Sequence, residues 1–169
     1  RSIEEAFKTL KICSGMTLSF HHHLRNGDYV LNMILAVAAR LEIKNLTIAV
    51  SSIFPSHKPL IEHIKSGVVT GIDTNYISGP VAEAVSQGIL AKPIVMRTHG
   101  GRARAIECGQ LRIDVAFIAA PAADCYGNLN GVYGKSACGS LGYAMPDAQY
   151  AEKVVAVTDN LMPYPLYPV

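Results

Sequence analysis

The stretch LTIAVSS, residues 46–52, decides the fold of this chain. Its first five residues, Leu46 to Val50, form a continuous apolar run, which is typical of a strand buried on both faces of a parallel sheet. Ser51 and Ser52 follow at the carboxyl end of that strand. A buried parallel strand needs crossover connections and covering helices, so the flanking segments should alternate between helix and strand.

Helical and strand patterns do alternate along the rest of the chain. Ser2 to Glu5 has the capping-box pattern of a helix start, and Gly15 is expected to stop that helix. Asp28 is a suitable N-cap for a helix that runs to Leu41 with apolar residues on one face. Further strands are expected at 16–20, 68–76, 94–98, 115–120 and 154–158, and further helices at 58–65, 80–88 and between 98 and 115. This order predicts an α/β fold, with a mostly parallel sheet that has helices on both faces.

The composition indicates one globular domain and argues against several classes of protein. Half of the 169 residues are hydrophobic, so the chain can bury one substantial core. A charged fraction of 17% and a formal net charge of +2, with scattered Lys and Arg, argue against a disordered or nucleic-acid-binding chain. Neither a membrane-spanning apolar run nor a leader pattern is expected. The four cysteines are widely spaced without a CxxC pair, which indicates reduced thiols in a cytoplasmic protein. They are Cys13, Cys108, Cys125 and Cys138.

Two segments depart from the alternating pattern. Residues 122–144 are rich in Gly, Asn and Tyr and are predicted to form a hairpin or another ordered excursion. Residues 162–169 carry three prolines in eight residues, which is typical of a connection between domains. We therefore expect one α/β domain over residues 1–161 and a proline-rich connection over residues 162–169.

Four polar loops are expected at one edge of the sheet. Parallel strands all end on the same edge, and open α/β sheets bind ligands there. The loops are His21–His23, Ser51–Ser52, His99–Arg102 and 121–128. Where such a loop precedes a helix, free N–H groups and the helix dipole favour an anion. The sequence therefore predicts a site for a small polyanion. The candidate binding residues are Ser19, His21, His22, His23, Ser51, Ser52, Gly100, Gly101 and Arg102.

The same loops have other interpretations. Adjacent side chains of an extended backbone point to opposite sides, so His21 to His23 are poorly suited to one metal ion, and no metal site is predicted. The histidines could instead cap the next helix, and Gly100 and Gly101 could simply permit a tight turn. Ser51 and Ser52 lack the GxSxG context of a nucleophile, and no catalytic residue is assigned.

Long blocks of the chain resemble a known family. They are SFHHHLRNGD (19–28), KNLTIAVSSIFPSHKPLIEHIKSGVVTGI (44–72), HGGRARAIECG (99–109) and IDVAFIAAPAADCYGNLNGVYGKSACGSLGYAM (113–145). With these blocks the chain resembles the citrate lyase α chain family over essentially its whole length. The DVAFI…AD…GN pattern alone is similar to the broader CoA-transferase family, and it is far less specific. The resemblance implies a CoA-transferase-like three-layer α/β/α fold. Because family members are considerably longer, it also implies that this chain is the first of two similar α/β halves.

The resemblance further implies an activity and partners. It implies a citrate:acyl-carrier-protein transferase, in which citrate replaces acetate on a thioester through a mixed anhydride and without a covalent enzyme intermediate. The thioester belongs to a CoA-like prosthetic group on the acyl carrier protein, the γ chain, so no cofactor is expected to be bound covalently to this chain. The β chain, a citryl lyase, is a further expected partner in an oligomeric complex, whereas nucleic acid and membranes are not expected partners. In this reaction the triple histidine would form part of a carboxylate-binding wall.

Two alternatives from other classes of protein remain. A non-catalytic domain of the same fold type would sense a small polyanion, and would bind citrate or a sugar phosphate without acyl exchange. A metal-dependent hydrolase would combine the triple histidine with His57, His63 and His99, and would require a transition metal. Neither alternative accounts for the long blocks shared with the citrate lyase α chain family.

Overall fold

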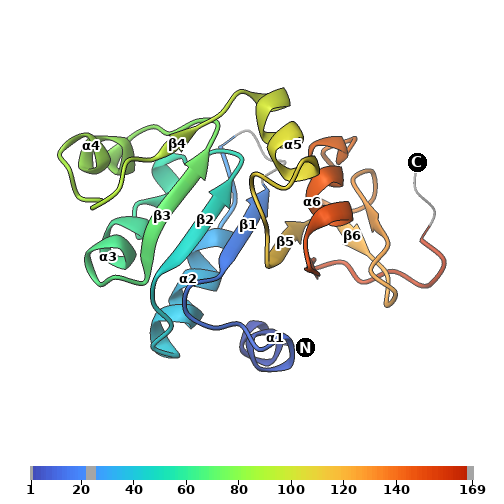
Figure 1. Ribbon diagram of the computed structural model, residues 1–169. Helices are drawn as coiled ribbons and strands as arrows, with labels where there is room; N and C mark the ends of the chain where they lie inside the picture. The colour runs from blue at the N-terminus through green and yellow to red at the C-terminus, as the bar shows by residue number, and fades with distance from the viewer. Residues whose placement is uncertain (1, 22–25, 167–169) are drawn as a thin grey trace.

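Residues 2–21 and 26–166 are described by a computed structural model, and they form a three-layer α/β/α unit (Figure 1). Its centre is a sheet whose strands lie in the order β4-β3-β2-β1-β5-β8. The strands are β1 (Thr17–His21), β2 (Leu46–Val50), β3 (Val69–Thr74), β4 (Val95–Met96), β5 (Val115–Ala119) and β8 (Lys153–Val157). Every neighbouring pair in this sheet is parallel. The α/β fold class predicted from the sequence is therefore confirmed.

The two central strands carry side chains of opposite character on their two faces. β2 occupies the predicted run and lies between β3 and β1, while β1 lies between β2 and β5. Leu18 and Phe20 of β1 belong to the main hydrophobic core. Because side chains alternate along a strand, Ser19 and His21 point to the opposite face. A single strand thus contributes to the core and to a polar cluster.

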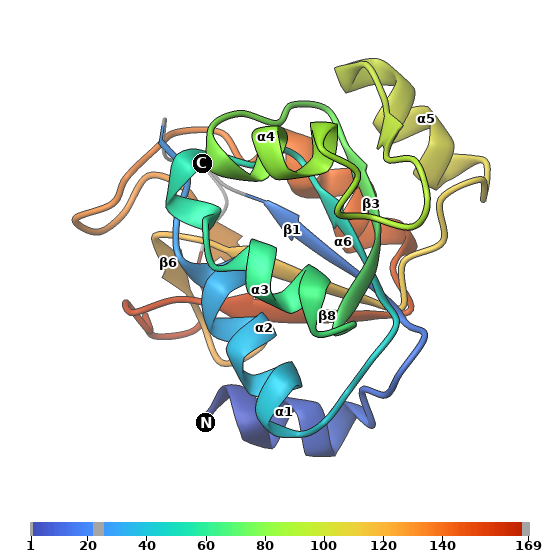
Figure 2. The ribbon, with the colours of Figure 1, turned by 90° about the vertical axis from the view of Figure 1, so that its left-hand side faces the viewer.

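Four helices cover one face of the sheet, and the main hydrophobic core lies beneath them (Figure 2). They are α1 (Ile3–Leu10), α2 (Val30–Arg40), α3 (Leu60–Lys65) and α4 (Pro80–Ser86). Phe7 of α1 stacks on Phe117 of β5 with ring centroids 6.4 Å apart, and Phe117 stacks on Phe20 at 5.6 Å. Burial of each such side chain stabilises the fold by about 1.5–3 kcal/mol.

The opposite face is covered by α5 (His99–Glu107) and α6 (Met145–Tyr150), which pack against each other. A short 3-10 helix, η2 (Gly142–Ala144), leads into α6. The hydrophobic cluster beneath them is smaller and rich in alanine, with Ala49 and Ala105 among its members. These small side chains leave room for polar groups between the sheet and the helices.

The first helix begins as predicted but ends earlier. Its capping box is present, since Glu5 N donates to Ser2 Oγ at 3.1 Å and Ser2 N donates to Glu5 Oε2 at 3.4 Å. The expected stop at Gly15 is wrong, because α1 ends at Leu10. Lys11 takes the left-handed conformation there, and its N–H bonds the last carbonyls of the helix.

Other element boundaries also differ from the sequence-based expectation. The expected N-cap at Asp28 is wrong, because α2 starts at Val30 and its N-cap is Tyr29. The Asp28 carboxylate nevertheless accepts from Val30 N, the first amide of the helix, at 2.8 Å. A 3-10 turn, η1 (Pro55–His57), precedes α3. The helix α6 lies where no helix was expected, and it proves important for the site below.

The segment after β5 forms the predicted hairpin. β6 (Ala122–Ala123) pairs antiparallel with β7 (Leu129–Asn130). Asp124 follows β6 and accepts hydrogen bonds from the amides of Tyr126, Asn128 and Leu166. Residues 162–166, expected to form part of a connection, therefore lie against this hairpin. Burial opposes ionisation of Asp124, but these bonds and one from the Asn128 side chain lower its pKa to about 2.

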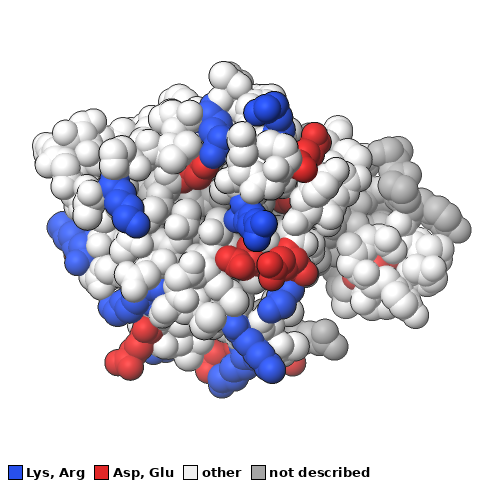
Figure 3. All heavy atoms as spheres, in the orientation of Figure 1, with Lys and Arg blue, Asp and Glu red and all other residues white. Residues whose placement is uncertain are grey.

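Positive and negative side chains are mixed on the face of the molecule drawn in Figure 3. Figure 3 shows Lys and Arg spread over that face, with Asp and Glu among them. Within the described ranges, none of the helices is long and apolar enough to cross a membrane. All four cysteines lie in those ranges and have free thiols.

Candidate functional site

The predicted polar loops lie at the carboxyl edge of the sheet. β1 adjoins β2 and β5 directly, so the residues that follow these three strands are neighbours. β4 lies beyond β3, but α5, which follows it, packs back against α6 (Figure 1). His22 and His23 lie outside the described residues, whereas the other seven candidate binding residues lie within them.

A buried carboxylate, Asp147 of α6, joins two of the candidate residues. Ser19 Oγ donates to Asp147 Oδ1 at 2.5 Å, and His21 Nε2 lies 2.8 Å from Asp147 Oδ2. The three residues are 0%, 3% and 0% exposed, in the order Ser19, His21 and Asp147. The two-residue alternation of β1 therefore aligns Ser19 and His21 on one carboxylate.

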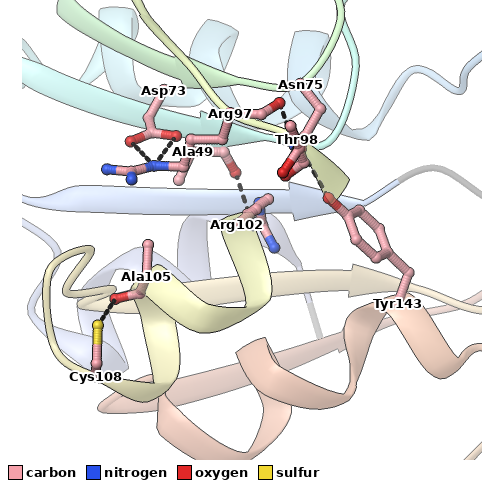
Figure 4. Close-up of polar contacts among 9 residues, drawn as sticks. All are labelled: Ala49, Asp73, Asn75, Arg97, Thr98, Arg102, Ala105, Cys108 and Tyr143. Carbon is pink, nitrogen blue, oxygen red and sulfur yellow. Dashed lines mark hydrogen bonds and ion pairs between the residues drawn. The ribbon is translucent and has the colours of Figure 1, made fainter. Parts of the chain in front are cut away.

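Arg102 binds the same carboxylate. This candidate binding residue lies on α5, and its side chain is 0% exposed. Its two terminal nitrogens each donate to one Asp147 oxygen at 2.7 Å, and one of them also donates to Ala49 O at 3.4 Å, as Figure 4 shows for the carbonyl contact. Such a bidentate pair fixes both geometry and charge. Three candidate residues are thus brought together, around a partner inside the protein.

The electrostatics of this cluster follow from its burial. Burial favours the neutral acid at Asp147, but the hydrogen bonds from Arg102 and His21 outweigh it and hold the pKa of Asp147 well below its usual range. The carboxylate that results favours a proton on His21 Nε2, the atom that faces it. Arg102 and Asp147 are neutral as a pair, so a protonated His21 would give the cluster one positive charge.

Tyr143 of η2 covers the cluster. Its ring meets the His21 ring edge-on with centroids 5.7 Å apart, and Arg102 Cζ lies 5.7 Å from its centroid, within the cation–π range. The His99 ring lies 5.3 Å away on another side. The Tyr143 hydroxyl donates to Asn75 Oδ1 at 2.7 Å. Burial raises the pKa of Tyr143, so the hydroxyl stays protonated and acts as a donor.

Asn75, which follows β3, fixes the start of α5. Its amide donates to Arg97 O at 2.9 Å and to Thr98 O at 2.8 Å (Figure 4). Arg97 itself pairs with Asp73 of β3 at 2.8 Å. Thr98 is the N-cap of α5, and its hydroxyl accepts from Gly101 N at 3.0 Å. The ends of β3 and β4 therefore orient α5 so that Arg102 reaches Asp147.

The two candidate glycines have different surroundings. A Cβ added at Gly100 would meet open space, whereas one added at Gly101 would lie 2.8 Å from Thr98 Oγ1. The Gly101 amide is already engaged by the N-cap. Gly101 is therefore needed for the cap itself, and Gly100 leaves the approach to the α5 N-terminus open.

Ser51 and Ser52 are buried at the end of β2, being 4% and 8% exposed. Ser51 N donates to Phe20 O at 3.2 Å, which continues the β1–β2 pairing. The Ser51 hydroxyl has no hydrogen-bond partner within residues 2–21 and 26–166. An unpaired buried hydroxyl costs about 1–3 kcal/mol, and such groups in native proteins call for an explanation. Ser51 is therefore a candidate ligand contact.

A groove of about 490 Å³ opens at the same edge, over the ends of β5 and β8. Its walls are mainly apolar, and they come from the start of α2, the two strand ends and the segment after β7. The lining includes Tyr29, Met33, Ala120, Pro121, Cys138 and Thr158. Burial raises the pKa of the Cys138 thiol, which keeps that wall uncharged. The volume lies in the usual range for a small-molecule site.

Sequence reasoning does not find Asp147, Tyr143 or Asn75. One signal for α6 exists, because Pro146 followed by Asp147 is typical of the first turn of a helix. No local pattern indicates that the carboxylate meets Arg102, which lies 45 residues earlier. That contact depends on how α5 and α6 pack.

The histidines of the hydrolase alternative that the structure describes do not form a metal site. His57 bonds Phe54 and Asp28, His63 lies on α3, and His99 packs near Tyr143. In the part of the chain that the structure describes, no three His, Cys, Asp or Glu side chains are placed to hold a metal ion.

The fold defines a class of protein, and the sequence then defines the family. The chain is similar to an acyl-CoA transferase from Escherichia coli O157:H7, solved as a thioester complex with CoA, with a TM-score of 0.66 and 13% identity. This match covers 99% of this chain and 43% of that chain, and it shows a CoA-transferase-like fold. The sequence model of the family described as citrate lyase, alpha subunit (CitF), matches residues 1–169. The chain therefore belongs to the citrate lyase alpha subunit family.

Two relatives illustrate the match. The citrate lyase alpha chain of Haemophilus influenzae is 49% identical over 168 residues, which are 99% of this chain and 34% of the relative. A crystal structure from Streptococcus mutans, described as the alpha subunit of citrate lyase in complex with citrate, has a TM-score of 0.96 and 55% identity, and the match covers 99% of this chain and 33% of that one. The chain thus spans about a third of the length of both relatives.

Proposed function

We propose that this chain forms the substrate-binding edge of a citrate:acyl-carrier-protein transferase, in which citrate replaces acetate on the carrier's thioester. The observation that carries this proposal is the match to the Streptococcus mutans protein, whose structure is described as a complex with citrate and has a TM-score of 0.96 to this chain. At 55% identity, the fold and the edge loops can be compared residue by residue.

The proposed reaction is a direct exchange of acyl groups. A citrate carboxylate attacks the carbonyl carbon of the acetyl thioester, the C–S bond breaks, and a mixed citryl-acetyl anhydride and a thiolate form. The thiolate then attacks the citryl carbonyl of the anhydride, and acetate leaves with the electron pair of the C–O bond. The protein needs to hold a trianion in attack geometry and to stabilise the developing oxyanions.

The carboxyl edge offers groups of this kind. We assign the Ser51 hydroxyl to a citrate carboxylate, because it is buried at this edge and has no partner among the described residues. Ser52 and the open approach at Gly100 lie at the same edge and complete the proposed wall together with His22 and His23. Hydroxyl, imidazole and N–H donors all favour a carboxylate.

The buried cluster supports this wall from beneath. Arg102 and Ser19 already bind Asp147, so their contribution to citrate binding acts through His21, which the same carboxylate holds. Gly101 contributes through the cap of α5. A protonated His21 would supply positive charge next to the bound trianion.

The groove beside the wall suits the second substrate. The thiol end of a CoA-like prosthetic arm is a long, slender chain of methylene groups and amides, and the groove is mainly apolar, about 490 Å³ in volume and open at the carboxyl edge. We propose that the acyl carrier protein, the γ chain, inserts this arm there. The β chain, a citryl lyase, would then cleave the citryl thioester within the same complex.

The test is an exchange assay with the full-length protein. Acetyl-acyl carrier protein and citrate are mixed with enzyme, and citryl-acyl carrier protein and free labelled acetate are measured. Carrier protein without its prosthetic group serves as the control. We expect stoichiometric release of acetate, and tighter binding of citrate than of acetate by calorimetry. Citrate binding without any acyl exchange would instead favour a polyanion sensor, and absence of citrate binding would contradict the proposal.

A further inference from the structure

The segment 53–57, between β2 and α3, is firmly anchored on its β3 side. Ile53 N donates to Tyr76 O at 2.8 Å, which continues the parallel pairing past the strand ends. Pro55 packs against Gly79, where an added Cβ would lie only 2.9 Å from Pro55 Cγ. This segment therefore has little freedom to shift along the carboxyl edge.

The other side of the segment holds the start of α2. Asn32 Nδ2 donates to Ser56 O at 2.9 Å, and Ser56 Oγ donates to Asn26 O at 3.3 Å. Gly27 has a φ of +81°, and an added Cβ there would lie 2.9 Å from the Phe54 ring. Residues 26–32 are thus seated closely against the 53–57 segment.

His57 joins the two sides, with a separate role for each ring nitrogen. The side chain is buried, at 2% exposure. Phe54 N donates to His57 Nδ1 at 3.1 Å, so this nitrogen carries no proton. The proton of the neutral ring is then on Nε2, which donates to Asp28 O at 3.0 Å. Nδ1 shapes the 53–57 turn, and Nε2 holds Asp28, whose carboxylate bonds the first amide of α2.

Asp28 leads directly into the proposed acyl site. Its carboxylate accepts from Val30 N, the first amide of α2, and Asp28, Tyr29, Val30 and Met33 all line the groove. We propose that His57 is a positioning residue, which fixes the α2 wall of the groove through its Nε2–H bond to Asp28. This inference rests on one part of the proposed function, namely that the groove binds the thioester arm of the carrier protein. His57 does not line the groove, so it acts through Asp28 rather than on the substrate.

Two variants separate the roles of the two ring nitrogens. In His57→Gln, the side-chain amide ends near the position of Nε2 and can still donate to Asp28 O. In His57→Asn, the amide ends near the position of Nδ1 and can only accept from Phe54 N. We expect kcat/KM for acyl exchange in the full-length protein to fall about three- to tenfold in His57→Asn, through KM for the carrier thioester. In His57→Gln the change should be smaller than about threefold.

A purely structural role in the 53–57 turn predicts the reverse order, because only Asn keeps the acceptor for Phe54 N. Equal KM values in the two variants, or a larger loss in His57→Gln, would therefore overturn the proposal. Ile64→Val in α3, which removes one buried methyl group from the main core, shows how far a small loss of stability alone changes KM. Amide hydrogen exchange over residues 29–33 should be faster in His57→Asn than in His57→Gln. That readout tests the positioning role even if the wild-type protein shows no acyl exchange.

Discussion

The two faces of the sheet carry different kinds of side chain. Under α1 to α4, the strands present large apolar side chains, and aromatic rings stack from α1 across β5 to β1. Under α5 and α6, the same strands present Ala49, Ala116 and the polar pair Ser19 and His21. The main hydrophobic core lies on the first face, while the second face holds a carboxylate and a guanidinium that are both 0% exposed.

This difference teaches where stability and function reside. Apolar burial is favourable residue by residue, so the α1–α4 face tolerates small changes at a modest cost. Buried charges are stable only as a complete set, because each one loses its hydration and needs the others. The charged cluster around Asp147 gains little stability over an apolar core of equal volume. We therefore relate it to the citrate site proposed above.

The largest effect is expected from breaking the cluster. Asp147→Ala leaves Arg102 buried without its carboxylate, and removal of one partner of such a pair costs about 3–5 kcal/mol. Ile34→Val on the opposite face removes one methyl group and should cost only about 0.5–1.5 kcal/mol. Urea unfolding of the two variants measures both losses, and citrate affinity should change only in the first.

A double variant shows what the cluster is for. Arg102→Met combined with Asp147→Leu replaces the charged pair by apolar groups, and it should recover most of the stability that Asp147→Ala loses. Acyl exchange should not recover, because His21 then lacks the carboxylate that holds it. Recovery of activity together with stability would mean that the pair has only a structural role.

Much of the fold follows from local sequence patterns. The continuous run 46–50 became a central strand, and the alternation of helix and strand gave the parallel order and the shared carboxyl edge. Helix ends were less accurate, since the left-handed Lys11 closes α1 without the glycine that usually does so. The contact of Leu166 with Asp124 depends on tertiary packing, which no local pattern encodes.

Strand order predicts where the candidate residues lie, but it predicts few of the contacts that they make. Strand topology placed Ser19, His21, Ser51 and Arg102 at or near one edge, and the structure brings three of these residues to one carboxylate. The partner itself, Asp147, could not be predicted because it comes from a helix of six residues after a long excursion. Sequence patterns report which side chains share an edge, and the packing of α5 on α6 decides which of them meet.

The second effect is an acid-dependent loss of stability. Asp147 and Asp124 both have lowered pKa values in the folded state, that of Asp124 being about 2 against an ordinary 3.8. Below about pH 4 the unfolded chain therefore binds more protons than the folded one, and the free energy of unfolding falls as the pH is lowered. Above that pH both contributions are fully present. Thermal unfolding between about pH 6 and pH 2 measures the decline.

Asp124→Asn separates the two carboxylates of this prediction. The substitution removes the contribution of Asp124 to the pH dependence of the free energy of unfolding. The contribution of Asp147 remains, because its partner Arg102 is unchanged. The variant should therefore show a shallower decline between about pH 4 and pH 2 than the wild type. If the free energy of unfolding declined equally in both proteins, the pKa of Asp124 would be the same in the folded and the unfolded state.

The smallest loss of stability is expected for Ser51→Ala. Comparing it with Ser19→Ala tests which serine stabilises the fold and which binds ligand. Both serines are buried on the central strands or directly after them, but Ser19 donates to Asp147 at 2.5 Å whereas Ser51 Oγ has no partner among the described residues. Ser19→Ala removes a hydrogen bond to a charged group and should cost about 1.5–3 kcal/mol of unfolding free energy. Ser51→Ala removes a hydroxyl that has no partner among the described residues, so no hydrogen bond is lost and the free energy of unfolding should not fall. If that hydroxyl binds citrate, the same variant should bind citrate roughly tenfold or more weakly by calorimetry. Unchanged citrate affinity with raised stability would show that the Ser51 hydroxyl is merely an unsatisfied group of the fold.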